Sequence, residues 1–232
     1  LLWLVTLAWA LQHRPHPAPP PRDGHVQSPK AGASVRDLRR VLDSGETLKG
    51  AAESIFSFNQ GLIDALCDIV PAVKLQSAYY ELLGFEGVRI FAETIAYAKS
   101  KGLYVIADVK RNDIDSTAEA YAEAYLGETA VEGRTFAAFD ADGVTVNPYL
   151  GRDGIAPFAR LCAEKDKSAF VLVKTSNPSS GELQDRDLEG RPLYEQVAAL
   201  LRRWGGECMT ESGWSQLGAV VGATFPKEQQ TL

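Results

Sequence analysis

Apolar residues recur along residues 48–222 with two different periods, and the order of these periods predicts the class of fold. Spacings of three and four positions, typical of one face of a helix, mark five segments. Short runs that are apolar at nearly every position lie between them and are typical of strands covered on both faces. We therefore expect helices at 48–68, 87–100, 116–126, 154–163 and 193–204, and strands at 72–74, 103–108, 143–147, 168–174 and 217–222.

The first two helices show the clearest apolar faces. Pro71 ends the first helix, and Gly102 closes the second. The expected buried face of the first helix consists of Ile55, Phe58, Leu62, Leu66 and Ile69, and that of the second consists of Val88, Phe91, Ile95 and Ala98.

Alternating strands and helices at these spacings suit right-handed crossovers between parallel strands, which gives an α/β fold. Two architectures remain open, a (β/α)8 barrel and an open doubly wound sheet, because periodicity alone does not separate them. A complete barrel has eight strands and usually needs roughly 250 residues. The chain has 232 residues. If it is a barrel, one strand falls in the altered front end, one beyond Leu232, and another could lie within 135–141.

The front end, residues 1–34, differs from the rest of the chain. An apolar run at 1–10 could pass for the core of a signal peptide, but no basic region precedes it. The next residues are rich in proline, which favours extended, solvated chain. A frameshift near Ala10 is an alternative explanation, because the neighbouring reading frame could encode a regular opening. Residues 35–232 are expected to form one domain.

Composition and charge narrow the class of partner. The net charge of −6 and the pI near 5.2 argue against nucleic acid or an anionic membrane as the main partner. No internal segment approaches the roughly 20 apolar residues of a membrane span. Cys67, Cys162 and Cys208 lack metal-ligand spacing, and we expect reduced thiols in a cytoplasmic protein.

Four charged residues of alternating sign follow the predicted strands. Asp108 and Lys110 lie two positions apart at the end of a strand, so their side chains should project to the same side. Lys74 ends the preceding strand and should stand beside Asp108, and Asp113 follows in the next loop. Charged groups at the carboxyl ends of barrel strands are where catalysis is expected. A purely structural ion-pair cluster is the alternative interpretation.

A longer stretch of sequence gives this set a family context. Residues 105–114, Val-Ile-Ala-Asp-Val-Lys-Arg-Asn-Asp-Ile, followed by Ser116-Thr117-Ala118, resemble the signature of the orotidine 5'-phosphate decarboxylase family, in its bacterial branch. Four further segments are similar to strand ends of that family and occur in the same order. They are residues 71–81, 145–151, 173–178 and 220–224. The chain is thus identified as a member of this family, which implies a (β/α)8 TIM barrel, here incomplete at both ends.

The resemblance also implies a reaction. Family members decarboxylate orotidine 5'-phosphate to uridine 5'-phosphate in pyrimidine biosynthesis, without a metal or an organic cofactor. By this resemblance Lys110 stabilises a carbanion-like intermediate at C6 and protonates it. Asp108 lies near the departing carboxylate, and Lys74 bridges Asp108 and the ribose hydroxyls.

Further residues receive roles from the same resemblance. Asp113, Ile114 and Thr117 would reach the active site of a partner subunit, which makes the enzyme a homodimer. Ser176 would read the pyrimidine edge, and Gln184 would span pyrimidine and phosphate. A turn hydroxyl at Ser176 and an ordinary exposed loop residue at Gln184 are the alternatives.

The chain departs from the family pattern at both ends. The family's Gly-Leu-Asp at the first strand is absent from the front, and the chain stops before the family's glycine-rich phosphate loop and its arginine. We therefore expect the full-length gene product to be a decarboxylase and this chain to be weakly active or unstable. Two rivals remain: a magnesium-dependent sugar-phosphate decarboxylase or aldolase, although Lys74 replaces its acidic ligand, and an inactive nucleotide-binding fragment.

Overall fold

A computed structural model describes residues 2–3 and 47–223 of the chain. The chain divides into two compact units, residues 1–105 and residues 106–232. The irregular front end, with the frameshift interpretation attached to it, lies outside the described residues except for Leu2 and Trp3. Among residues 47–223, no helix combines the length and apolar character needed to cross a bilayer.

The first unit places three helices beside a short strand. They are α2 (Leu48–Leu66), α3 (Ser77–Glu81) and α4 (Gly84–Ser100), and the strand is β2 (Ala72–Gln76). The two-residue strand β1 (Leu2–Trp3) pairs antiparallel with β2. Strand β3 (Tyr104–Arg111) begins in this unit, where the Tyr104 N–H donates to the carbonyl of Pro71 (3.0 Å). Strand β2 runs two residues beyond Lys74, so the expectation that Lys74 ends it was wrong.

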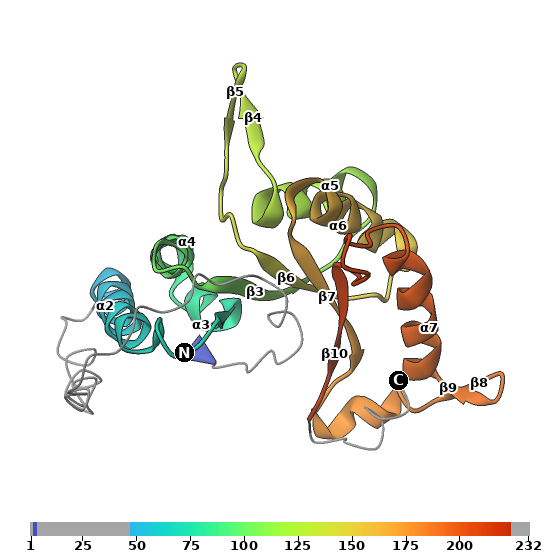
Figure 1. Cartoon of the computed structure of the whole chain (residues 1–232). Helices are drawn as coiled ribbons and strands as arrows, with labels where there is room; N and C mark the ends of the chain where they lie inside the picture. The colour runs from blue at the N-terminus through green and yellow to red at the C-terminus, as the bar shows by residue number, and fades with distance from the viewer. Residues whose placement is uncertain (1, 4–46, 224–232) are drawn as a thin grey trace, which may run out of the picture. The chain divides into compact units, whose positions relative to one another are not determined.

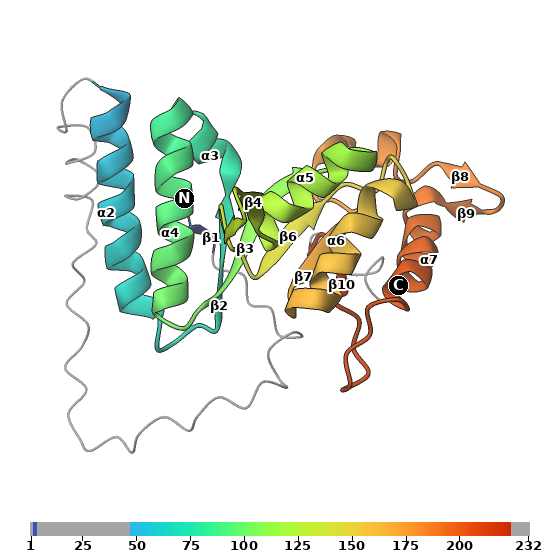
Figure 2. The ribbon, with the colours of Figure 1, turned by 90° about the horizontal axis from the view of Figure 1, so that it is seen from above.

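Helix α2 packs beside α4 (Figure 2), but with a different buried face from the one that its apolar residues suggest. The Thr47 side chain caps α2 by accepting a hydrogen bond from Gly50 N–H (3.1 Å). The buried residues are Ala52, Asn59 and Ile63. Ile69 lies beyond the helix and is 66% exposed, so the predicted face was partly wrong.

A buried polar contact explains this shift of the α2 face. The Asn59 amide donates to the Tyr80 hydroxyl on α3 (2.8 Å), which makes it possible to bury an amide at a helix interface. The Tyr80 ring meets Phe91 of α4 edge to face, with centroids 5.1 Å apart. Burial raises the pKa of Tyr80 to about 12, so the phenol stays neutral.

The second unit holds a parallel sheet whose strands follow the chain in order. Its strands are the rest of β3, β6 (Gly143–Val146), β7 (Ser168–Lys174) and β10 (Leu217–Val221). Neighbours in the order β3-β6-β7-β10 pair in parallel. In an open doubly wound sheet the order reverses at a switch point. No reversal occurs among these four strands. Their order in the sheet follows their order in the chain, as it does for consecutive strands of a barrel.

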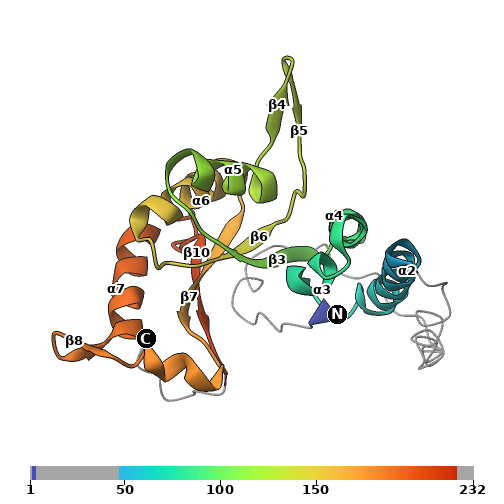
Figure 3. The ribbon, with the colours of Figure 1, turned by 180° about the vertical axis from the view of Figure 1, so that it is seen from behind.

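Helices connect these strands, as predicted. They are α5 (Asp115–Leu126), α6 (Arg152–Lys165) and α7 (Leu193–Gly205). Figure 1 shows α5 beside α6, and Figure 3 shows α7 running along β7 and β10. The five strands and five helices expected from periodicity are all present within the described residues, with ends shifted by a few positions.

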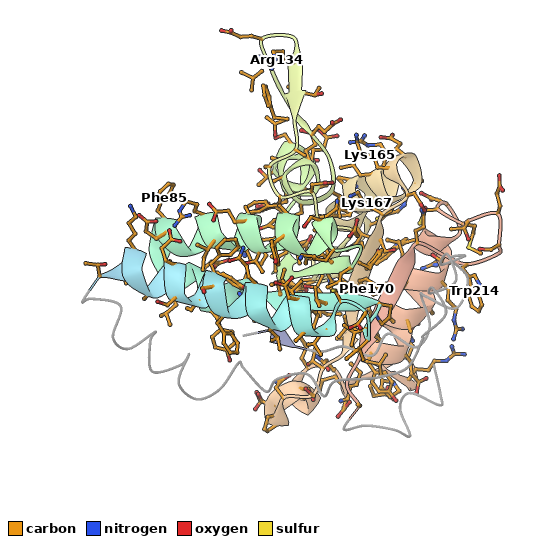
Figure 4. All side chains as sticks on the ribbon, turned by 60° about the vertical axis from the view of Figure 1, so that its left-hand side comes forward. Phe85, Arg134, Lys165, Lys167, Phe170 and Trp214 are labelled. Carbon is orange, nitrogen blue, oxygen red and sulfur yellow. The ribbon has the colours of Figure 1, made fainter. Side chains whose placement is uncertain are left out.

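Two hairpins interrupt the regular alternation. Strands β4 (Thr129–Val131) and β5 (Arg134–Phe136) form an antiparallel hairpin that projects from the second unit, with Arg134 near its tip (Figure 4). The expected barrel strand within 135–141 was therefore wrong, because β5 pairs only with β4. A smaller hairpin joins β8 (Asp187–Leu188) to β9 (Arg191–Pro192), after the 3-10 turn η1 (Pro178–Glu182).

Gly87 provides a test of the packing between α3 and α4. A Cβ atom at this position would overlap the backbone carbonyl of Tyr80, whereas one at Gly61 on α2 would meet nothing within 4 Å. We expect Gly87→Ala to lower the free energy of unfolding by about 2 kcal/mol or more. Gly61→Ala should be neutral or stabilise by about 0.5–1 kcal/mol. Urea unfolding of both variants measures the difference, and equal stabilities would contradict the described packing.

Candidate functional site

A buried carboxylate with two hydrogen-bond donors lies near the carboxyl end of β3. Asp108 is 5% exposed, and its Oδ1 accepts hydrogen bonds from Lys110 Nζ (2.6 Å) and from Thr145 Oγ1 (2.9 Å). An ionised carboxylate in a protein interior requires such partners, because burial alone penalises the charge. The sequence predicted that the side chains of Asp108 and Lys110 project to the same side, and their contact confirms this prediction.

The backbone of β3 changes conformation where it presents Lys110. The pairing of β3 with β6 shifts register between Ala107 and Arg111, and Lys110 adopts a left-handed backbone with φ of 48°. Such a conformation costs of order 1–3 kcal/mol for a residue other than glycine, and residues that adopt it are found in turns and clustered at functional sites. Simple alternation along a regular strand, the basis of the sequence prediction, does not describe this segment.

Thr145 on β6 holds the two charged residues in place. Its hydroxyl accepts from the Lys110 backbone N–H (2.9 Å) and donates to the Asp108 carboxylate (2.9 Å). Thr145 itself is 4% exposed. The side chain of Lys110 is 44% exposed, against 6% for that of Asp108, so the ammonium can reach a ligand while the carboxylate stays fixed.

The loop after β3 carries the residues expected to reach a partner subunit. Asp113 accepts a hydrogen bond from the N–H of Ile114 (2.9 Å), the residue that directly precedes α5. Ile114 is 48% exposed, and Thr117 is exposed in the first turn of α5. Asp113 is partly buried, and the role of these three residues toward a second subunit stays a prediction.

The other predicted substrate contacts follow β7. Ser176 is exposed just beyond the strand, where the backbone of Gly222 approaches it so closely that a Cβ atom would lie 3.0 Å from the Ser176 Cβ. Gln184 uses Oε1 to accept from the Thr175 N–H (2.9 Å) and Nε2 to donate to the Thr175 hydroxyl (2.7 Å). One Nε2–H remains for a further acceptor.

Lys74 belongs to the first unit, at the middle of β2, where it is partly buried. Its expected place beside Asp108 therefore stays a prediction. Among residues 47–223, no group of three or more His, Cys, Asp or Glu side chains could hold a metal ion.

Two residues of this region were not singled out from the sequence. The sequence did offer a sign of the role of Thr145, because it is the one hydroxyl residue in a buried four-residue strand. The resemblance to the family covered the segment that begins with Thr145 but gave this residue no role. Lys174, the last residue of β7, is 1% exposed and ion-paired with Asp185. A lysine after a run of apolar residues usually indicates a solvated strand end, so the sequence did not predict the burial of Lys174.

A parallel β/α sheet whose strands follow the chain in order, with a lysine–carboxylate pair at the carboxyl end of a strand, is typical of the (β/α)8-barrel enzymes. Comparison with protein families narrows the class. Residues 41–231 match the family described as orotidine 5'-phosphate decarboxylase / HUMPS, and the chain belongs to this family.

Individual relatives agree with this assignment. Orotidine 5'-phosphate decarboxylase of Caldicellulosiruptor saccharolyticus is 48% identical over 170 residues, which cover 73% of this chain and 56% of that protein. The Rhodopirellula baltica protein of the same name is 45% identical, over 72% of this chain and 54% of its own length. The chain thus spans little more than half the length of these relatives.

Solved structures support the barrel. The Leishmania donovani OMP decarboxylase superposes with a TM-score of 0.63 at 30% identity, covering 84% of this chain and 72% of that one. The UMP synthase of the same organism gives a TM-score of 0.62 at 33% identity, covering 84% of this chain and 39% of that one. The fold is therefore a TIM barrel of which the described residues form part, as the sequence predicted.

Thr145 gives a test of how the charged pair is held. Thr145→Val removes a donor to Asp108 and an acceptor for the Lys110 N–H, both in a buried setting. We expect the free energy of unfolding to fall by about 1–3 kcal/mol. Thr145→Ser keeps the hydroxyl and should lose less. Chemical denaturation compares the two, and a Val variant as stable as the Ser variant would contradict the described hydrogen bonds.

Proposed function

We propose that the protein decarboxylates orotidine 5'-phosphate to uridine 5'-phosphate as a step of pyrimidine biosynthesis. One observation carries the proposal: the Asp108–Lys110 pair, held by Thr145 at the carboxyl end of β3. Membership of the family and the activity named for relatives at 45% and 48% identity support it.

The proposed reaction needs a cation next to a position of developing negative charge. The bond between C6 and the carboxylate carbon breaks, carbon dioxide leaves, and the electron pair stays on C6. The Lys110 ammonium stabilises this charge and then transfers its proton to C6. Its partial exposure leaves it open to a substrate, and its ion pair with Asp108 holds it beside that carboxylate before the substrate arrives.

Asp108 contributes by its fixed position. A carboxylate near the departing carboxylate of the substrate disfavours the ground state relative to a transition state in which that charge moves away. The hydroxyl of Thr145 and the ammonium of Lys110 hold this carboxylate before binding, so little reorganisation is needed during the reaction.

The remaining roles complete the proposed site. Lys74 would link Asp108 to the ribose hydroxyls, Ser176 would read the pyrimidine edge, and Gln184 would contact pyrimidine and phosphate. The spare Nε2–H of Gln184 is the donor suited to that contact. Three free cysteines among the described residues are typical of a reducing compartment, and we place the enzyme in the cytoplasm.

The enzyme is proposed to act as a homodimer in which Asp113, Ile114 and Thr117 complete the partner's active site. Exposed apolar side chains in this part of the second unit suit such an interface. Ile114 is 48% exposed after β3, and Tyr149 after β6 is 78% exposed. Apolar side chains of this kind mark an interface where they form one contiguous patch.

Replacing the proposed proton donor tests the reaction. Lys110→Ala should lower kcat/KM for orotidine 5'-phosphate by about a thousandfold or more, because it removes both the stabilising charge and the proton. Lys165→Ala, which breaks a surface ion pair with Glu128, is the matched control and should keep the wild-type rate. A Lys110 variant with the control's activity would remove Lys110 from the mechanism.

Chelation separates this proposal from its nearest rival. EDTA should leave the rate unchanged, since the proposed chemistry uses no metal ion. A rate lost to EDTA and restored by magnesium would favour the magnesium-dependent sugar-phosphate enzymes instead.

Mixing two inactive variants tests the shared site. Lys110→Ala and Asp113→Ala damage the same site from different subunits, so a mixed dimer keeps one undamaged site. Random reassociation of equal amounts should restore about a quarter of the wild-type activity. Activity that stays at the level of the separate variants would show that Asp113 serves its own subunit.

A further inference from the structure

Lys174 is a buried lysine at the carboxyl end of β7, the edge of the sheet where the proposed site lies. It is the last residue of the strand and is 1% exposed, although lysine is among the residues least often buried. Removing an ammonium group from water is costly unless a partner compensates its charge. The contacts of this ammonium therefore indicate what its burial achieves.

The charge of Lys174 is compensated by residues near the end of the connection between β7 and α7. Its Nζ forms an ion pair with Asp185, which follows the turn η1, and lies 5.5 Å from the ring centroid of Tyr194 in the first turn of α7. The side chain of Asp185 is itself 51% exposed. The ion pair thus connects the end of β7 to Asp185, which lies in an exposed loop.

The adjacent pair of residues repeats this connection with hydrogen bonds. Thr175 is held by both functional atoms of the Gln184 amide, at 2.9 and 2.7 Å. Lys174 and Thr175 on one side therefore match Asp185 and Gln184 on the other. Residues 176–183 between them form a closed loop that includes Ser176 and η1.

The carbonyl of Lys174 fixes the position of the strand end from another side. It accepts a hydrogen bond from the N–H of Gly222 after β10 (2.7 Å), and Gly222 packs against Ser176. Lys174 therefore joins β7, the end of β10 and the loop that carries two predicted substrate contacts. A side chain with 1% exposure cannot itself touch a ligand, which makes its role indirect.

We propose that Lys174 is a positioning residue: its ion pair with Asp185 closes the 176–183 loop and so sets Ser176 and Gln184 for the substrate. The inference rests on the proposed function for its effect on the substrate, whereas the closure of the loop is a property of the protein alone. An open loop would present Ser176 and Gln184 in many arrangements, and binding would have to order them.

Kinetics of Lys174→Met and Asp185→Asn test the effect on the substrate. We expect KM for orotidine 5'-phosphate to rise about tenfold in each variant while kcat changes by less than about threefold, because the loop binds rather than reacts. The double variant should be no worse than the more impaired single variant, since the two residues act as one unit. Asp185→Glu keeps the charge at an exposed position and should restore most of the affinity.

A second lysine of the same strand region supplies the matched control. Lys167, labelled in Figure 4, directly precedes β7, is 12% exposed, and pairs with Asp140 at 2.9 Å. Lys167→Met removes a similar ion pair at the opposite end of the strand. It should lower stability without raising KM, and an equal rise of KM in this control would overturn the positioning role.

Hydrogen exchange tests loop closure without any reaction. The backbone amides of Thr175 and Gln184, at the two ends of the closed loop, and that of Ser180 within it donate hydrogen bonds to this segment. They should exchange faster in Lys174→Met and Asp185→Asn than in the wild type, and at the wild-type rate in Lys167→Met. Unchanged exchange in both loop variants overturns the proposal. A wild-type protein without decarboxylase activity would instead refute the proposed function, and exchange would still decide whether the pair closes the loop.

Discussion

The hydroxyl of Thr145 decides where the two charges of the candidate site lie. It joins a carboxylate that is almost fully buried to a backbone N–H in a strained segment, and it comes from the neighbouring strand. The parallel pairing of β3 with β6 is what brings it there. The rest of the second unit supports this contact, because α5 and α6 pack together beside the strands that carry it. A cation held beside a fixed anion is the preorganised arrangement on which the proposed carbanion chemistry would rely.

The regular part of the fold could be predicted from the sequence because burial repeats with the period of each element. Strand β7 was expected at 168–174 and is found there, since an unbroken apolar run between polar ends has few other interpretations. The buried face of α2 was predicted less well, because it includes the polar residue Asn59. The burial of this amide depends on a hydrogen bond to the hydroxyl of Tyr80, which is far away in the sequence. The hairpin of β4 and β5 was missed for a similar reason, since its short strands are exposed and carry no burial signal.

The candidate site was predicted where it depends on neighbours in sequence and missed where it depends on neighbours in space. Asp108 and Lys110 lie two positions apart, so their contact could be expected. Thr145 and Lys174 act through partners on other strands and loops, so the sequence around each residue does not indicate its role. Ser176 and Gln184 were named through family resemblance, and in the proposed role of Lys174 they act together through a shared loop rather than as separate side chains.

The hairpin of β4 and β5 has a practical consequence. Its tip, Glu132 and Gly133, has positive φ at both positions, which is the backbone of a tight two-residue turn. The hairpin projects from α5, and both of its strands are exposed along their whole length. Chain inserted at such a tip disturbs little buried structure. Residues 132–133 are therefore a suitable place to introduce an affinity tag, a fluorescent reporter or new chain ends while the charged pair of β3 is left untouched.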